Sequence, residues 1–319
     1  MRGQGRQLGE NLRIEVEASR SLRFQDGSPV RAASGVARLG DGWLVVQDDA
    51  THGAWCRPAG IESLRILPPV DGHDYFSTSA ANKHLKPDFE AVVALDGQGE
   101  GRVLVLGSGS TPARMRAALV TSLQRRGQST VVDLSDVYVA VAGLLGVGIA
   151  ELNLEGACIV GRQLRWFNRG NVRAGVPSAS VDVDVDALLA VFAGTGSRDQ
   201  VVHSLSGRLW YDLGEVAGVS LGITDAVTLA DGGVLISAAA EDTTNAYDDG
   251  PVVGAVLALL EGTTVVAKAA VPLIDGRVQK VEGLAVIDSG LRHARVLAVV
   301  DDDDPELASV EHCLRLSWG

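Results

Sequence analysis

The sequence contains few aromatic residues, few cysteines and no long apolar run. Only 4% of its 319 residues are Phe, Trp or Tyr, whereas 46% are hydrophobic, so aliphatic side chains must supply most of the core. The three cysteines, Cys56, Cys158 and Cys313, are odd in number and far apart, which argues against a disulfide framework or a zinc site. We expect reduced, buried thiols.

Positive charge is also scarce. The chain has 28 Lys and Arg against 40 Asp and Glu, a net charge of −12, which argues against a nucleic-acid surface. Residues 1–17 lack the apolar run of a signal peptide, and no uncharged stretch is long enough to cross a bilayer. These absences predict a cytoplasmic protein with neither a nucleic-acid nor a membrane partner.

The common catalytic signatures are absent as well. There is no G-x-S-x-G nucleophile elbow and no H-E-x-x-H motif, and the six histidines form no pair with the spacing of metal ligands. The sequence therefore gives no indication of nucleophilic catalysis by Ser or Cys.

A unit of similar pattern occurs five times along the chain. Each unit opens with an oxygen-bearing side chain and a small residue, continues as an apolar run and a Gly-containing turn, and ends in a second β-prone run. The five openings are SGVARL from Ser34, EAVVAL from Glu90, EGACIV from Glu155, DAVTLA from Asp225 and EGLAVI from Glu282. Their intervals of 56, 65, 70 and 57 residues hold four antiparallel strands and a loop, the content of a propeller blade.

The two ends of the chain together make up the fifth unit. The segment LRIEVEA at 12–18 alternates, with Leu12, Ile14 and Val16 on one face, and is the candidate strand that completes the last blade. We expect an all-β fold in a single domain over residues 1–319, a five-bladed β-propeller whose N-terminal strand closes the last blade. Residues 136–150 predict a helix or a buried strand, and residues 186–194 a helical turn.

The repeated oxygen side chains are expected to form a ring. The first strand of a blade lines the central channel, so residues at one position in every first strand point at the axis: Ser34, Glu90, Glu155, Asp225 and Glu282. Converging carboxylates repel one another unless a cation neutralises them. Oxygen-only ligands favour calcium over magnesium or manganese. The alternative is that each acid caps a strand or accepts backbone hydrogen bonds without any metal.

A polar mouth is expected above this ring. The second strand of each blade runs antiparallel to the first, so its end lies at the same face. The polar strings there are Asp48-Asp49, Ser108 to Ser110, Asn168 to Asn171, Glu241-Asp242 and Asp301 to Asp304. Four cations, Lys86, Arg114, Arg169 and Lys280, fall near the same face and are candidates to clamp a phosphate or carboxylate. The alternative for each cation is an ion pair with a rim acid.

Four long motifs carry a resemblance to known propellers. The segments KPDFEAVVALDGQGEGRVLVLGSGSTPAR, LNLEGACIVGRQLRWFNRGN, SAAAEDTTNAYDDGPVVG and KVEGLAV resemble a bacterial group of propeller proteins related in outline to the phytase-like and SdiA-regulated propellers. This resemblance implies the fold but supplies no activity.

A more distant resemblance concerns the ring. Calcium-activated nucleotidases, the apyrases, are five-bladed propellers whose channel calcium is bound in the order Ser, Glu, Glu, Ser, Glu. The chain is similar in four of these positions and departs from the order at Asp225. Among nucleotide-contacting residues the resemblance extends at most to Asp48-Asp49 and Arg169.

Two functions remain open at this stage. The first is a calcium-dependent hydrolase of a phosphoanhydride, phosphoester or other anionic small molecule, with sugar-lactone hydrolysis as a variant; Arg114, Arg169 and Lys280 would stabilise developing charge, and Asp49 or Glu241 would act as base. The second is a non-catalytic propeller that binds a small ligand or a protein and holds a structural calcium ion.

Overall fold

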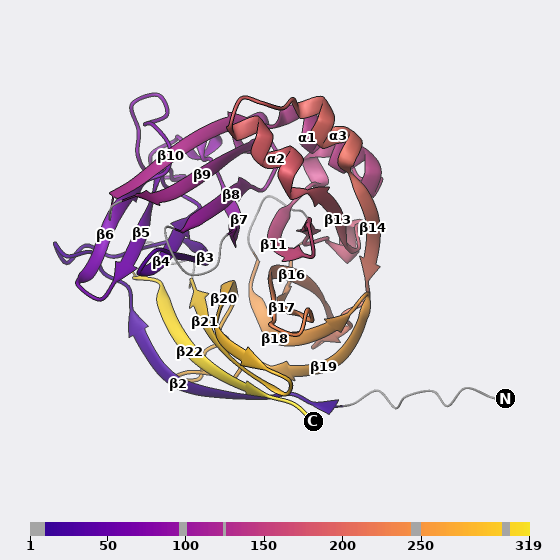
Figure 1. Cartoon of the computed structure of the whole chain (residues 1–319). Helices are drawn as coiled ribbons and strands as arrows, with labels where there is room; N and C mark the ends of the chain where they lie inside the picture. Colours follow the sequence, from indigo (N-terminus) through magenta and orange to yellow (C-terminus); the bar gives the residue numbers. More distant parts are fainter. Residues whose placement is uncertain (1–9, 96–100, 124–125, 244–249, 302–306) are drawn as a thin grey trace.

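Five small β-sheets surround a common axis (Figure 1), so the chain is a five-bladed β-propeller, as predicted. The computed structural model describes residues 10–95, 101–123, 126–243, 250–301 and 307–319. The predicted turn residues 96–100 and the acids Asp302, Asp303 and Asp304 lie outside the described residues.

The blades follow one another along the chain, each with its first strand innermost. Blade 1 contains β3 (Ala33–Leu39), β4 (Gly42–Gln47), β5 (His52–Arg57) and β6 (Gly60–Arg65). Blade 2 contains β7 (Phe89–Ala94), β8 (Arg102–Gly107), β9 (Arg116–Leu123) and β10 (Arg126–Asp133). Blade 3 contains β11 (Leu154–Val160), β12 (Gln163–Asn168), β13 (Ser178–Asp184) and β14 (Ser206–Tyr211). Blade 4 contains β16 (Val219–Thr228), β17 (Val234–Glu241), β18 (Val252–Glu261) and β19 (Thr264–Ala270), with the short β15 (Glu215–Val216) and β1 (Glu10–Asn11) at its edges.

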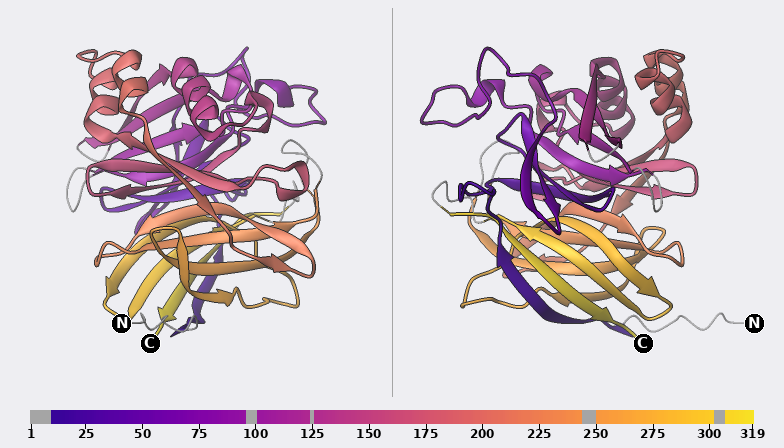
Figure 2. Two further views of the ribbon diagram at one scale, coloured as in Figure 1. Left: turned by 90° about the vertical axis from the view of Figure 1, so that its right-hand side faces the viewer. Right: turned by 60° about the vertical axis from the view of Figure 1, so that its left-hand side comes forward.

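Blade 5 joins the two ends of the chain, which confirms the predicted closure. It contains β20 (Val281–Gly290), β21 (His293–Val300), β22 (Val310–Ser317) and, outermost, the N-terminal β2 (Arg13–Ser21). In the antiparallel pairing of β2 with β22, Ile14 lies opposite Leu316 and Val16 opposite Leu314. Both views in Figure 2 show β2 beside the yellow C-terminal strand. These apolar pairs seal the ring between the first and the last part of the chain.

Three helices fill the connections around blade 3. The segment predicted as a helix or a buried strand contains α1 (Ser135–Leu145), and the predicted helical turn is α2 (Val185–Phe192), followed by α3 (Arg198–Ser204). The helix α1 places Tyr138 against Trp166, with ring centroids 4.9 Å apart, and all three helices cover the outer side of the propeller (Figure 1). Among the described residues, no helix is long and apolar enough to cross a membrane.

Each innermost strand contains a β-bulge at a corresponding position, and β20 has a second one at Ile287. At the shared position, the pairing with the second strand omits one residue in every blade: Ser34, Glu90, Glu155, Thr224 and Glu282. A bulge releases its residue from the ladder and redirects the side chain. Four of these five residues are the predicted ring residues, and the fifth is Thr224 instead of Asp225.

The prediction for blade 4 was therefore wrong by one residue. The Thr224 hydroxyl donates to the carbonyl of Val281 at 2.6 Å, the residue before Glu282, just as the Ser34 hydroxyl donates to the carbonyl of Phe89, the residue before Glu90. Asp225 instead turns to the neighbouring inner strand, where its carboxylate accepts the backbone N–H of Leu284 at 2.6 Å. The pair Asp225-Ala226 matched the acid-plus-small pattern, but Asp225 occupies the position of the small residue.

Small residues follow the bulge in the other blades because the inner strands approach closely there. A Cβ atom at Gly156 would lie 2.8 Å from the Cα of Asp225, and one at Gly283 would lie 2.6 Å from the Cα of Gly35. Backbone atoms cannot move aside as a flexible side chain can. The oxygen side chain and the small residue after it are thus two parts of one local geometry, which explains why they recur together.

Candidate metal and ligand site at the channel mouth

The starts of the inner strands and the ends of the second strands enclose a polar cavity at one face of the propeller. Its volume is about 470 Å³, and a smaller cavity of about 90 Å³ shares part of its lining. The residues common to both are Asp48, Lys86, Glu90, Glu155 and Arg169. The predicted mouth is therefore a real enclosure, formed by strands from all five blades.

On one side of the mouth lies an acidic group formed by Asp48, Asp88 and Glu90. A carboxylate oxygen from each lies within 4.8 Å of the others. Lys86 pairs with Asp48 and, at 2.9 Å, with Asp88, while Arg114 pairs with Asp88 at 2.7 Å. Among the described residues, Glu90 has no hydrogen bond or ion pair. Within the part of the chain that the structure describes, the Glu90 side chain is thus the one carboxyl of this group that forms no ion pair.

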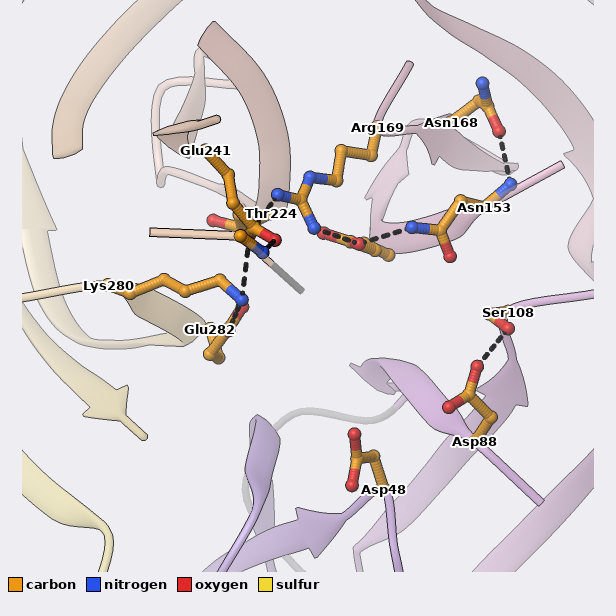
Figure 3. A network of polar contacts seen from close by, with 12 residues as sticks. Asp48, Asp88, Ser108, Asn153, Asn168, Arg169, Thr224, Glu241, Lys280 and Glu282 are labelled. Carbon is orange, nitrogen blue, oxygen red and sulfur yellow. Dashed lines mark hydrogen bonds and ion pairs between the residues drawn. The ribbon is translucent and has the colours of Figure 1, made fainter. Parts of the chain in front are cut away.

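On the opposite side lies a second acidic group, formed by Glu155, Glu241 and Glu282 and held by two cations (Figure 3). The Arg169 guanidinium donates to Glu155 at 3.0 Å and also pairs with Glu241. The Lys280 ammonium pairs with Glu241 at 3.2 Å and with Glu282 at 2.8 Å. The two cations thus link three carboxylates from three blades.

Side-chain amides fix the position of Glu155. The Asn153 amide donates to its Oε1 atom at 2.6 Å, and Asn153 is itself held through its backbone N–H by Asn168 at 2.8 Å. The other carboxylate oxygen, Oε2, is buried and has no hydrogen-bond partner among the described residues. A buried carboxylate oxygen without a partner is costly, so this atom points to a missing ligand.

The four predicted clamp residues are all engaged by carboxylates. Lys86, Arg114, Arg169 and Lys280 each pair with at least one acid, which confirms the ion-pair alternative for these contacts. The six acids of the two groups outnumber these four cations. Across the whole lining of the two cavities, eight carboxyls face seven Lys and Arg side chains.

Burial and the neighbouring charges shift the pKa values of the acids in different directions. Burial, reinforced by the charges of Asp88 and Asp48, raises the pKa of Glu90 well above its usual range. Burial likewise raises the pKa of Asp48 to about 6 and that of Glu282 to about 7, although lysines lie beside both. Burial opposes the charge of Glu241 too, but Arg169 and Lys280 outweigh it and lower the pKa of Glu241 to about 2. The mouth therefore holds carboxyls of very different acidity.

The predicted base Asp49 lies at the edge of the same cavity. Burial and the neighbouring charge of Asp48 raise the pKa of Asp49 to about 7. Its Oδ1 atom is buried without a hydrogen-bond partner among the described residues. Asp225, in contrast, lines neither cavity of the mouth.

These pKa values predict how the stability of the metal-free protein depends on pH. The folded-state pKa values of Asp48, Asp49 and Glu282 lie above the ordinary values, so the folded protein binds more protons than the unfolded chain between about pH 4 and pH 7. Their stabilising effect is present below pH 4 and is lost as the pH rises through 6 to 7. From pH 5 to pH 8 we expect a loss of roughly 6 kcal/mol, or about 10 °C in melting temperature.

The measurement is a thermal melt in EDTA at several pH values. Glu241 does not interfere in this window, because its low pKa places its own transition below about pH 4. A melting temperature that stays constant or rises from pH 5 to pH 8 would show that these carboxyls are ionised in the folded protein.

Two functional positions were missed in the sequence. Asp88 and Asn153 both lie two residues before a ring glutamate, the position that Lys280 holds in blade 5. Residues two apart on a strand share a face, so the same spacing that places Lys280 beside Glu282 could have identified Asp88 and Asn153. Asp88 also has a positive φ of 52°, a strained conformation for a non-glycine residue that is typical of functional sites.

Comparison with known proteins places the chain in a family. The family of unknown function DUF6910 matches residues 82–305, which include both acidic groups except Asp48. The chain belongs to the DUF6910 family. A search of curated proteins finds no match. The resemblance to phytase-like propellers, SdiA-regulated propellers and apyrases stays a prediction.

Solved structures are similar to this DUF6910 protein in fold. Glutaminyl cyclase from Myxococcus xanthus is 11% identical with a TM-score of 0.51, over 97% of this chain and 99% of that one. Aldose sugar dehydrogenase from Streptomyces coelicolor, in a PQQ-bound form, is 10% identical with a TM-score of 0.40, over 98% and 100%. A luciferin-regenerating enzyme is 10% identical with a TM-score of 0.41, over 94% and 95%. The likeness to glutaminyl cyclase supports the propeller fold alone.

Proposed function

We propose that the channel mouth binds a divalent cation, calcium in the first place, and that the protein is a metal-dependent hydrolase of a small phosphorylated or other anionic molecule. The observation that carries the proposal is the uncompensated carboxylate at the mouth. Glu90 has no partner among the described residues, and the buried Oε2 atom of Glu155 has none either. A cation held by Glu90 together with Asp48 and Asp88 would neutralise that group, and Glu155 faces the same cavity.

The donor set fits a hard cation. Asp48, Asp88 and Glu90 offer carboxylate oxygens within reach of one another, and Glu155 faces the same cavity. Neither His nor Cys lines the two cavities of the mouth, among the described residues. Oxygen ligands of this kind suit calcium, and magnesium or manganese less readily. The proposed ligand set differs from the predicted ring: it gains Asp48 and Asp88 and omits Ser34, Asp225 and Glu282.

When bound, a cation at this place would polarise a substrate oxygen or lower the pKa of a water molecule. The residues of the chain would then supply a general base and the groups that bind the anion. Asp49 borders the cavity and has a buried oxygen without a partner, so it is the better placed of the two predicted bases. Glu241 is committed to Arg169 and Lys280 and is unsuited to that role.

Anion recognition would use the cations that bridge the acids. Lys86, Arg169 and Lys280 line the larger cavity, and Arg114 lines the smaller one. A bound phosphate or carboxylate would have to share these groups with their present partners. The ion pairs hold the cations in place before a ligand arrives, which reduces the entropy that binding costs.

The ion pairs also favour a second candidate function. Because all four cations already have carboxylate partners, the mouth can be a rigid binding site in which the metal is structural and no substrate is turned over. This is the non-catalytic alternative, with a small molecule or a protein as the ligand.

A titration and an activity panel separate these functions. Calcium is titrated calorimetrically into EDTA-treated protein, and hydrolysis of nucleotides, phosphoesters and lactones is then measured with and without calcium. The proposal predicts calcium-dependent hydrolysis that Asp49→Asn abolishes while calcium binding persists. Binding without turnover would select the non-catalytic propeller, and no binding of calcium, magnesium or manganese would refute the metal site itself.

A further inference from the structure

A second polar cavity lies away from the channel mouth, at the outer edge of blade 5. Its volume is about 510 Å³. It is lined by residues of the edge strand β2, of the neighbouring β22 and of the loop before β20. Three of them, Ser19, His312 and Gln279, form a connected chain of hydrogen bonds.

The pairing of the blade creates this contact. Ser19 on β2 and His312 on β22 are directly opposite each other in the antiparallel ladder, although 293 residues separate them in sequence. On the next rung, Arg20 holds Glu311 through two hydrogen bonds of 2.9 and 3.1 Å, which helps to fix the register. Ser19 is exposed, whereas His312 is only 2% exposed. A buried imidazole thus stands directly behind a surface hydroxyl.

The backbone carbonyl of Arg277 ends this series of hydrogen bonds and determines the donor and acceptor in each of them. The backbone carbonyl of Arg277 can only accept, so the Gln279 amide must present its Nε2 atom to it, at 3.1 Å. The Oε1 atom of Gln279 then faces His312 Nε2 at 3.1 Å and accepts its proton. With its proton on Nε2, the imidazole is left with Nδ1 as an acceptor, and the Ser19 hydroxyl donates to it at 2.7 Å.

This arrangement has the three parts of an activated nucleophile. A hydroxyl donates to a base, and the base is held in one tautomer by a third group. Burial lowers the pKa of His312, so the imidazole is neutral and able to accept a proton at physiological pH. Arg20, Asp275 and Arg277 line the same cavity, and Arg20 is paired with Glu311.

We propose that Ser19 is a nucleophile with His312 as its general base and Gln279 as a positioning residue, and that the site accepts the acyl group of small carboxylic esters. The Ser19 Oγ atom bonds to the ester carbonyl carbon and its proton moves to His312 Nδ1. The bond from that carbon to the alcohol oxygen then breaks, and the alcohol leaves with the proton. Water releases the acid by the same steps and restores Ser19.

The test uses the full chain and 4-nitrophenyl acetate, in EDTA so that the channel mouth plays no part. We expect a burst of one nitrophenolate per protein, with acetyl found on Ser19 by peptide mass mapping. Ser19→Ala should lower the burst at least 100-fold. Ser21→Ala is the matched control, because Ser21 is exposed on the same strand and lines the same cavity, and it should retain the wild-type burst.

The role of Gln279 is tested by two substitutions. Gln279→Met removes the acceptor for the Nε2 proton and should slow acetylation at least tenfold. Gln279→Glu retains an acceptor and should restore most of the rate, an effect that a merely structural role would not produce. Melting temperatures verify that each variant is folded. An unchanged burst in Ser19→Ala, acetyl at another residue, or no acetylation of folded wild-type protein would each overturn the proposal.

Discussion

Replacement of Glu90 by Gln is expected to raise the melting temperature of the metal-free protein at pH 7.5 and to remove the stabilisation that the proposed calcium ion would give the wild type. Glu90 is a half-buried acid whose nearest charges include Asp88 and Asp48, so its own charge is unfavourable without a cation. The amide keeps the shape and loses the charge. We expect calcium affinity to fall on the order of 100-fold, because the charge of the ligands sets the affinity of such sites.

The substitution is expected to stabilise the metal-free protein but to weaken calcium binding. A general loss of folding would not produce this combination. Melting curves in EDTA and in excess calcium, together with calorimetric titration, measure both. Glu261→Gln is the control, since Glu261 is an exposed glutamate at the end of β18, and it should change neither quantity. If Glu90→Gln destabilises the metal-free protein and leaves calcium binding intact, Glu90 has a structural partner and is not a ligand.

Replacement of Arg169 by Met should be the most destabilising change at the mouth. Arg169 joins Glu155 of blade 3 to Glu241 of blade 4, and the three side chains are only 13, 9 and 2% exposed. Met leaves Glu155 without an ion-pair partner and Glu241 with Lys280 alone, which costs about 3–5 kcal/mol. Chemical denaturation measures the loss.

An exposed ion pair provides the comparison. Arg173 pairs with Asp242 nearby, but these side chains are 56 and 42% exposed, so Arg173→Ala should cost less than about 1 kcal/mol. Adding Glu155→Gln to Arg169→Met should recover part of the stability, because the carboxylate that has lost its cation is removed. Equal losses for Arg169→Met and Arg173→Ala would show that water reaches the Arg169 network and screens it.

The propeller could be predicted from the sequence because its repeat is local. The oxygen residue, the small residue after it and the turn between strands all lie within one hairpin, so each blade is recognisable by itself. The closing strand was recognisable too, since Leu12, Ile14 and Val16 alternate clearly. The same local pattern gave the wrong residue in blade 4, where it selected Asp225. Only the pairing register of β16 with β17 shows that the bulge falls on Thr224.

The chemistry at the mouth was less predictable because it depends on contacts between blades. Sequence placed Glu90, Glu155, Glu282 and the four cations near one face, but it could not show which acid would remain without a cation. That outcome depends on distances between residues such as Arg169 and Glu241, which lie 72 positions apart. The Ser19–His312 contact is an extreme case of the same limit.

Closure of blade 5 by β2 and β22 also bears on how the protein is made. β2 is synthesised long before β22, so the outermost strand of this blade must wait for the four intervening blades to emerge before it finds its partner. Pairing over such a separation is slow to form, since a long loop has to close. The hydrogen bond between Ser19 and His312 can exist only after that step. A reagent that modifies Ser19 through the proposed activation by His312 would therefore report that blade 5 has closed.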